Sequence, residues 1–71
     1  MSTSRDFTAE YREARKAKHA ANDLTAQLAA EKLARKIDRA AERAGVYLDV
    51  ITLDEEARLE VFPDAPRARV I

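Results

Sequence analysis

Apolar residues recur at spacings of three and four through the first part of the chain, which is the period of an amphipathic α-helix. Residues 6–44 contain no proline and no glycine, and Gly45 follows directly. A glycine just past a helix adopts the left-handed conformation without steric penalty. The pattern therefore predicts one long, coiled-coil-like helix over about residues 6–44, with Ser4 or Asp6 as its N-cap.

The apolar residues of this segment form two stripes rather than one. At about 100° per residue the centres of the stripes differ by roughly 130°, so the two halves are expected to bury different faces. We expect a kink near residues 22–30. Asp23 offers an alternative, because it can cap a second helix that begins at Leu24. The first stripe comprises Phe7, Tyr11, Ala14, Ala17, Ala21, Leu24 and Leu28, and the second Ala26, Ala30, Leu33, Ile37, Ala40 and Ala44.

Residues 46–62 follow a different pattern. Val46–Leu53 is rich in β-branched and aromatic residues, residues 54–57 are polar, and Arg58–Phe62 alternates. This predicts a β-hairpin over about 46–62, followed by an edge segment at 63–71 that adds a third strand. The expected fold class is α+β: one long N-terminal helix and a two- or three-stranded antiparallel sheet, in a single domain over residues 1–71.

The expected core lies between the second stripe and the hairpin. Leu33 and Ile37 would pack against the inner face of the sheet. That face would consist of Val46, Leu48, Val50, Leu59 and Val61.

Composition narrows the classes of function. A 71-residue chain is close to the size at which one core suffices, and the absence of cysteine removes disulfides and thiolate zinc sites as reinforcement. Thirteen Lys and Arg residues balance thirteen Asp and Glu residues. No run approaches the ~20 apolar residues of a membrane span, and no secretory signal pattern is present. We expect a cytoplasmic protein without a membrane partner.

No motif indicates a reaction. His19 and Asp23 lie four residues apart and can face one metal ion, but no third ligand accompanies them. The acidic residues 54–56 lack the ligand spacing of a calcium loop. With one histidine, no cysteine and no glycine-rich loop, we expect no enzyme, no metal site and no cofactor.

Two basic bands lie opposite the two apolar stripes. Basic side chains in a row can neutralise phosphates, so a nucleic-acid-binding accessory protein is the second hypothesis for function. The simpler interpretation is the solvated polar face of an amphipathic helix. The bands comprise Arg5, Arg12, Arg15, Lys16 and His19, and Lys32, Arg35, Lys36, Arg39 and Arg43.

The first hypothesis for function is protein–protein interaction. The first stripe has no cover within the chain, and four apolar residues fall on the outer side of the expected hairpin, namely Tyr47, Ile51, Leu53 and Phe62. We expect a dimer or higher oligomer, or an adaptor or inhibitor that docks on a larger complex. A helix followed by a β-hairpin recurs in small toxins, antitoxins, phage accessory proteins and virion components, which makes a phage or mobile-element protein one candidate, but no residue pattern selects among them. The expected partner contacts are Phe7, Tyr11, Arg12, Arg15, Leu24, Leu28, Tyr47 and Phe62.

Overall fold

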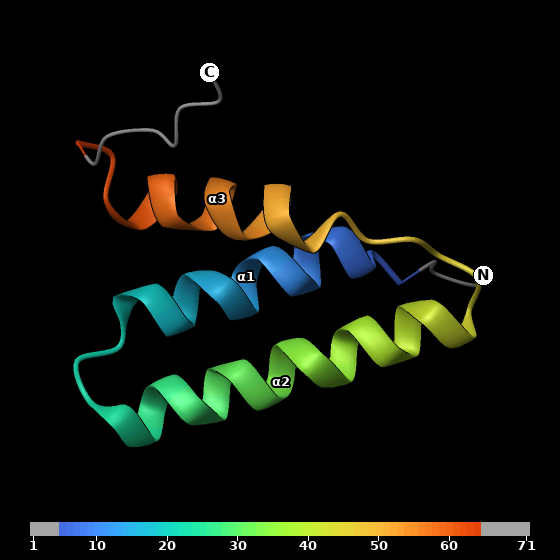
Figure 1. Ribbon diagram of the computed structural model, residues 1–71, viewed down its shortest axis with the longest axis horizontal. Helices are drawn as coiled ribbons and strands as arrows, with labels where there is room; N and C mark the ends of the chain where they lie inside the picture. Colours follow the sequence, from blue (N-terminus) through green and yellow to red (C-terminus); the bar gives the residue numbers. More distant parts are fainter. Residues whose placement is uncertain (1–4, 65–71) are drawn as a thin grey trace.

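The described part of the chain folds as three helices that share one core. The computed structural model describes residues 5–64, which form α1 (Phe7–Ala20), α2 (Leu24–Arg43) and α3 (Val50–Val61). Helix α1 lies in the middle and packs against both neighbours, whereas the backbones of α2 and α3 stay apart (Figure 1). Helix α2 runs antiparallel to α1, and α3 starts at the same end as α1.

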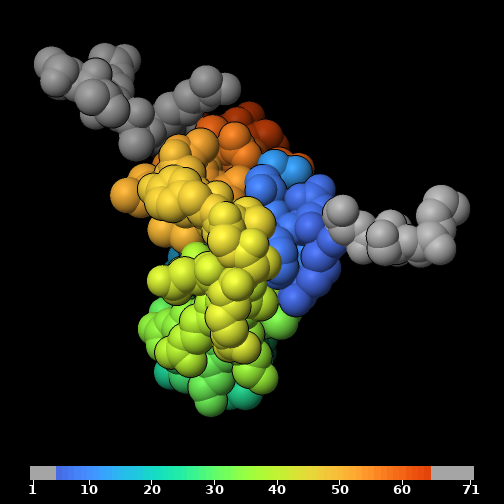
Figure 2. Space-filling view, turned by 90° about the vertical axis from the view of Figure 1, so that its right-hand side faces the viewer, coloured from blue at the N-terminus to red at the C-terminus, as the bar shows by residue number. Residues whose placement is uncertain are grey.

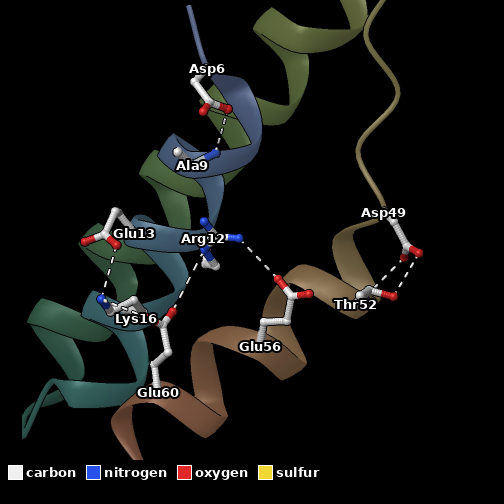
Figure 3. A network of polar contacts seen from close by, with 9 residues as sticks. All are labelled: Asp6, Ala9, Arg12, Glu13, Lys16, Asp49, Thr52, Glu56 and Glu60. Atoms are coloured by element: carbon white, nitrogen blue, oxygen red, sulfur yellow. Dashed lines mark hydrogen bonds and ion pairs between the residues drawn. The ribbon is translucent and has the colours of Figure 1, made fainter.

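The expected α+β fold is therefore wrong, since residues 5–64 contain no strand. Most of the expected hairpin is α3. Asp49 starts this helix as its N-cap: its Oδ1 accepts from the Thr52 amide at 3.2 Å and its Oδ2 from the Thr52 hydroxyl at 2.8 Å (Figure 3). The expected edge strand falls mainly on residues 65–71, outside the described residues.

Helical spacing explains why α3 forms despite its β-branched start. Leu53 and Ala57 are the buried residues of α3, and Val50 packs against the core one turn earlier. The polar residues 54–56, read from sequence as a turn, instead continue the helix. β-Propensity depends strongly on context, so the Asp49 cap and a buried face override the preference of residues 50–52 for a strand.

The single helix over residues 6–44 is also wrong, and the alternative in which Asp23 starts a second helix is confirmed. Asp23 Oδ1 accepts from the Ala26 amide at 2.7 Å, and Ala21 ends α1 with extended backbone. Because α2 folds back onto α1, α2 covers the N-terminal part of the first stripe. The expectation that this stripe lacks an intrachain cover is wrong for Tyr11 and Ala14, which are buried.

Both ends of the 6–44 segment carry the caps that the sequence predicts. Asp6 Oδ1 accepts from the Ala9 amide at 3.0 Å. Gly45 has a φ of +76°, its amide donates to the Glu42 carbonyl at 3.0 Å, and the Val46 amide donates to the Ala41 carbonyl at 2.8 Å. These two bonds form a Schellman motif, which ends α2 and releases the chain into a linker.

The linker, residues 44–49, crosses from the end of α2 past the start of α1 to α3. Figure 2 looks at this end of the molecule and shows the linker between α2 and α3, beside the first turns of α1. Leu48 is buried and joins the core cluster, which takes residues from all three helices. The large members of the cluster are Tyr11, Ile37, Leu48 and Leu53, with Phe7 and Val50 packed at its edge.

The core is thin. Among residues 5–64, every side chain with at most 1% exposure belongs to an alanine: Ala34, Ala41 and Ala57. Ile37 packs in the cluster with Leu48 as expected, but Leu33 remains 51% exposed, so its expected burial under a hairpin is wrong. Alanine at the contacts allows the helices to approach closely but buries little apolar surface.

Candidate interaction surfaces

An ionic contact joins α1 to α3. Arg12 Nη1 lies 3.2 Å from Glu56 Oε1, and Arg12 Nε lies 3.9 Å from Glu60 Oε2 (Figure 3). Lys16 Nζ lies 3.7 Å from Glu60 Oε1 and 3.2 Å from Glu13 Oε2. The basic face of α1 therefore lies against carboxylates that helical spacing brings to one side of α3.

Asp54 is the most connected carboxylate of this contact. Its Oδ1 accepts from Arg15 Nε and from His19 Nε2, each at 2.8 Å. The side chains of Arg15 and His19 are only 15% and 17% exposed. Burial by itself raises the pKa of Asp54, but the hydrogen bonds and positive charges of Arg15 and His19 together outweigh it, so the pKa lies below its ordinary value.

The first basic band predicted from the sequence is thus neutralised inside the chain. Arg12 and Arg15, two expected partner contacts, pair with α3, and Arg5 pairs with Glu10 at 2.8 Å. The candidate metal pair is also separated, because His19 donates to Asp54 whereas Asp23 caps α2. No group of three or more His, Cys, Asp or Glu side chains suited to a metal ion forms within the described residues.

The second basic band remains free in large part. Arg35 donates to Glu31 at 3.0 Å. The other four residues are exposed and make no hydrogen bond or ion pair with the rest of the 5–64 segment; we call them the α2 basic stripe: Lys32, Lys36, Arg39 and Arg43. At about 100° per residue they fall within roughly 60° of arc, on the exposed side of α2.

A groove of about 450 Å³ follows the seam between α1 and α2. Three alanines of α1 line one side of this seam groove, and Leu33 and Ile37 of α2 line the other. Two carboxylates, Glu10 and Glu13, complete the lining. The alanines of α1 that line the groove are Ala9, Ala14 and Ala17.

The eight expected partner contacts do not form one surface. Tyr11 is a core residue at 8% exposure, and Phe7 lies half-buried at the edge of the core. Four of the eight expected contacts are exposed apolar residues, and they are distributed over α2, the linker and the end of α3. They are Leu24 at 67%, Leu28 at 49%, Tyr47 at 88% and Phe62 at 49%.

The sequence reasoning missed Leu33 as a surface residue. It assigned Leu33 to the core because Leu33 and Ile37 are separated by one helical turn. On α2, however, Leu33 lies at the edge of the apolar arc, about 70° from its centre, and the apolar residues of α1 beside it in the groove are all alanines, which are too short to cover it. The alanine-rich composition of α1 was the available signal.

No helix in the described part of the chain has the length and apolar character that a membrane crossing requires.

Comparison with known proteins identifies no relative of this chain. No family model matches the chain, and neither the curated proteins nor the solved structures yield a match.

Proposed function

We propose that the protein acts without catalysis, by binding proteins, and that its partner is a second copy of itself. One observation carries this proposal: more large apolar side chains are exposed than buried. Within residues 5–64 four are buried, whereas seven are at least 40% exposed. The exposed ones are Leu24, Leu28, Leu33, Val46, Tyr47, Ile51 and Phe62.

The energetic consequence favours association. Burying one such side chain completely contributes about 1.5–3 kcal/mol, and a domain of this size has little stability to spare. Chains near the lower size limit commonly gain the missing burial by oligomerisation. A surface that buries some of these seven side chains in a partner would supply what the alanine core lacks.

The seam groove is the best candidate for this surface because it is self-complementary. Leu33 supplies a projecting side chain, and the α1 alanines beside it supply a recess. A two-fold axis parallel to the helices would place α2 of one copy over α1 of the other, so that each Leu33 meets the alanines of the partner. All neighbouring helices would then run antiparallel, as in an up-down four-helix bundle.

Two leucines of α2 provide a matched experiment. Leu33 and Leu28 are 51% and 49% exposed, but only Leu33 lines the seam groove. We expect the wild-type chain to sediment as a dimer at micromolar to submillimolar concentration. Leu33→Glu should produce a folded monomer, because it places a carboxylate in the apolar contact, whereas Leu28→Glu should leave the dimer intact.

Circular dichroism on both variants separates loss of association from loss of folding. A monomeric wild-type chain over the whole concentration range would contradict the proposal. Dissociation by Leu28→Glu but not by Leu33→Glu would also contradict it, since the interface would then lie on another face of α2.

A further inference from the structure

We infer that the α2 basic stripe binds the phosphate backbone of duplex DNA. The inference rests on a contrast between two basic faces that look alike in the sequence. The face on α1 is covered by carboxylates of α3, whereas the four cations of the stripe have no partner among residues 5–64. Unpaired cations in a row attract a polyanion, because binding releases its condensed counterions.

The position of α2 gives the stripe access to a duplex. The backbone of α2 lies close to that of α1 only, because α2 and α3 meet no closer than through side chains of the shared core. The buried residues of α2 centre about 160° around the helix from the stripe, so the stripe lies on the exposed side of α2. Lys36, Arg39 and Arg43 border a hollow there that Arg5 and Glu10 also line. A helix with side chains is about 10–12 Å wide, which the major groove of B-form DNA admits.

The charge pattern of α2 favours a phosphate backbone over other ligands. The stripe spans Lys32 to Arg43, about 16 Å along the helix, or roughly five base-pair steps at 3.4 Å. The acidic residues of α2 lie about 110° around the helix from the stripe. They are Glu31, Asp38 and Glu42.

Helix α2 contains no aromatic residue, so it has no platform on which single-stranded bases could stack. The face of α2 that carries the stripe also has no Asn or Gln to read adenine, and its Lys and Arg side chains are assigned to phosphates rather than to guanine edges. We therefore expect binding to a duplex without sequence preference.

A second copy of the chain is a poor ligand for the stripe. The carboxylates that α3 presents on one side, Asp54, Glu56 and Glu60, already pair with α1. The inference is thus separate from the proposed dimer, and the Leu33→Glu variant should retain DNA binding, weakened by the new carboxylate three residues from Lys36.

The test is fluorescence anisotropy of a labelled random-sequence duplex DNA over a range of salt concentrations. Four phosphate contacts predict that log Kd rises with log salt with a slope of about 3.6. Lys36→Gln with Arg39→Gln should weaken binding by about tenfold or more at low salt and lower the slope by about 1.8.

The matched control removes the same charge from the neutralised face. Arg12→Gln with Lys16→Gln also exchanges one arginine and one lysine, and it should change the affinity by less than about threefold. Circular dichroism confirms that both double variants are folded.

Several results would overturn the inference. They are the absence of duplex binding at low salt, equal losses in the two double variants, and tighter binding to duplex RNA than to DNA. Competition by poly-L-glutamate as effective as that by unlabelled DNA would also overturn it, and would indicate an acidic protein as the ligand.

Discussion

Arg15 Nε donates a 2.8 Å hydrogen bond to Asp54 Oδ1 and so joins α1 to α3 across 39 positions of the sequence. The same oxygen accepts from His19. Helix α3 buries only Leu53 and Ala57 within its own length, so its apolar contact with α1 is small. The position of α3 therefore depends on this ionic contact more than the position of α2 does.

Loss of the Asp54 charge should destabilise the fold. Asp54→Asn weakens the hydrogen bonds from Arg15 and His19, and we expect the free energy of unfolding to fall by about 1–2 kcal/mol after allowing for solvent screening. Urea unfolding followed by circular dichroism measures this change. Asp64→Asn, at an exposed residue, is the control and should be silent; equal effects of the two substitutions would show that the contact does not stabilise α3.

The same contact predicts a dependence on pH. The pKa of Asp54 lies below its ordinary value, so its contribution to stability is complete above the unfolded pKa and is lost as the pH falls through the folded pKa. We expect the free energy of unfolding to decrease below about pH 5, and more steeply in the wild type than in Asp54→Asn. Parallel pH profiles for the two proteins would disagree with this assignment.

The end of α2 depends on the backbone conformation of Gly45. A Cβ built at Gly45 meets no atom within 4 Å, so the cost of Gly45→Ala is that of a left-handed φ alone. This cost is about 1–2 kcal/mol. Gly45→Asn should cost less, because asparagine tolerates this region better. Thermal or urea unfolding of the two variants measures this difference. If Gly45→Ala is at least as stable as Gly45→Asn, the Schellman assignment is refuted.

Close helix approach at alanine predicts intolerance of larger residues. Ala41 has 0% exposure and Ala29 is exposed on the same helix. We expect Ala41→Leu to reduce the free energy of unfolding by about 1–3 kcal/mol through overpacking, and Ala29→Leu to change it by less than about 0.5 kcal/mol. A neutral Ala41→Leu substitution would mean that α2 does not pack closely on α1.

The helix caps of this fold can be predicted from the sequence. Which secondary structure the segments between the caps adopt is harder to predict. Asp6 and Gly45 act as predicted because their effects are local. Asp23 is a possible cap in the sequence, but the good helix formers around it favour a continuous helix. The fold back at Asn22 and Asp23 is decided by burial of Tyr11 and Ala14 under α2, a tertiary effect that local propensity does not contain.

The local pattern of the segment after Gly45 is misleading for a related reason. Asp49 followed by Thr52 is an N-cap pattern, but the β-branched residues between them gave the stronger local signal for a strand. The candidate surfaces follow from this error. The pairing of Arg12 and Arg15 with α3 could not be foreseen while residues 54–60 were assigned to a turn and a strand.

Disulfide cross-linking between single-cysteine variants tests the groove-to-groove dimer most directly, because the chain contains no cysteine of its own. In the proposed dimer Leu33 of one copy faces the groove alanines of the other, so an oxidised mixture of Ala17→Cys and Leu33→Cys should yield the mixed disulfide dimer. Mass spectrometry distinguishes it from either homodimer, which the two-fold arrangement disfavours. Failure to form the mixed dimer, or equal cross-linking of Ala17→Cys with Leu28→Cys, would contradict the proposed interface.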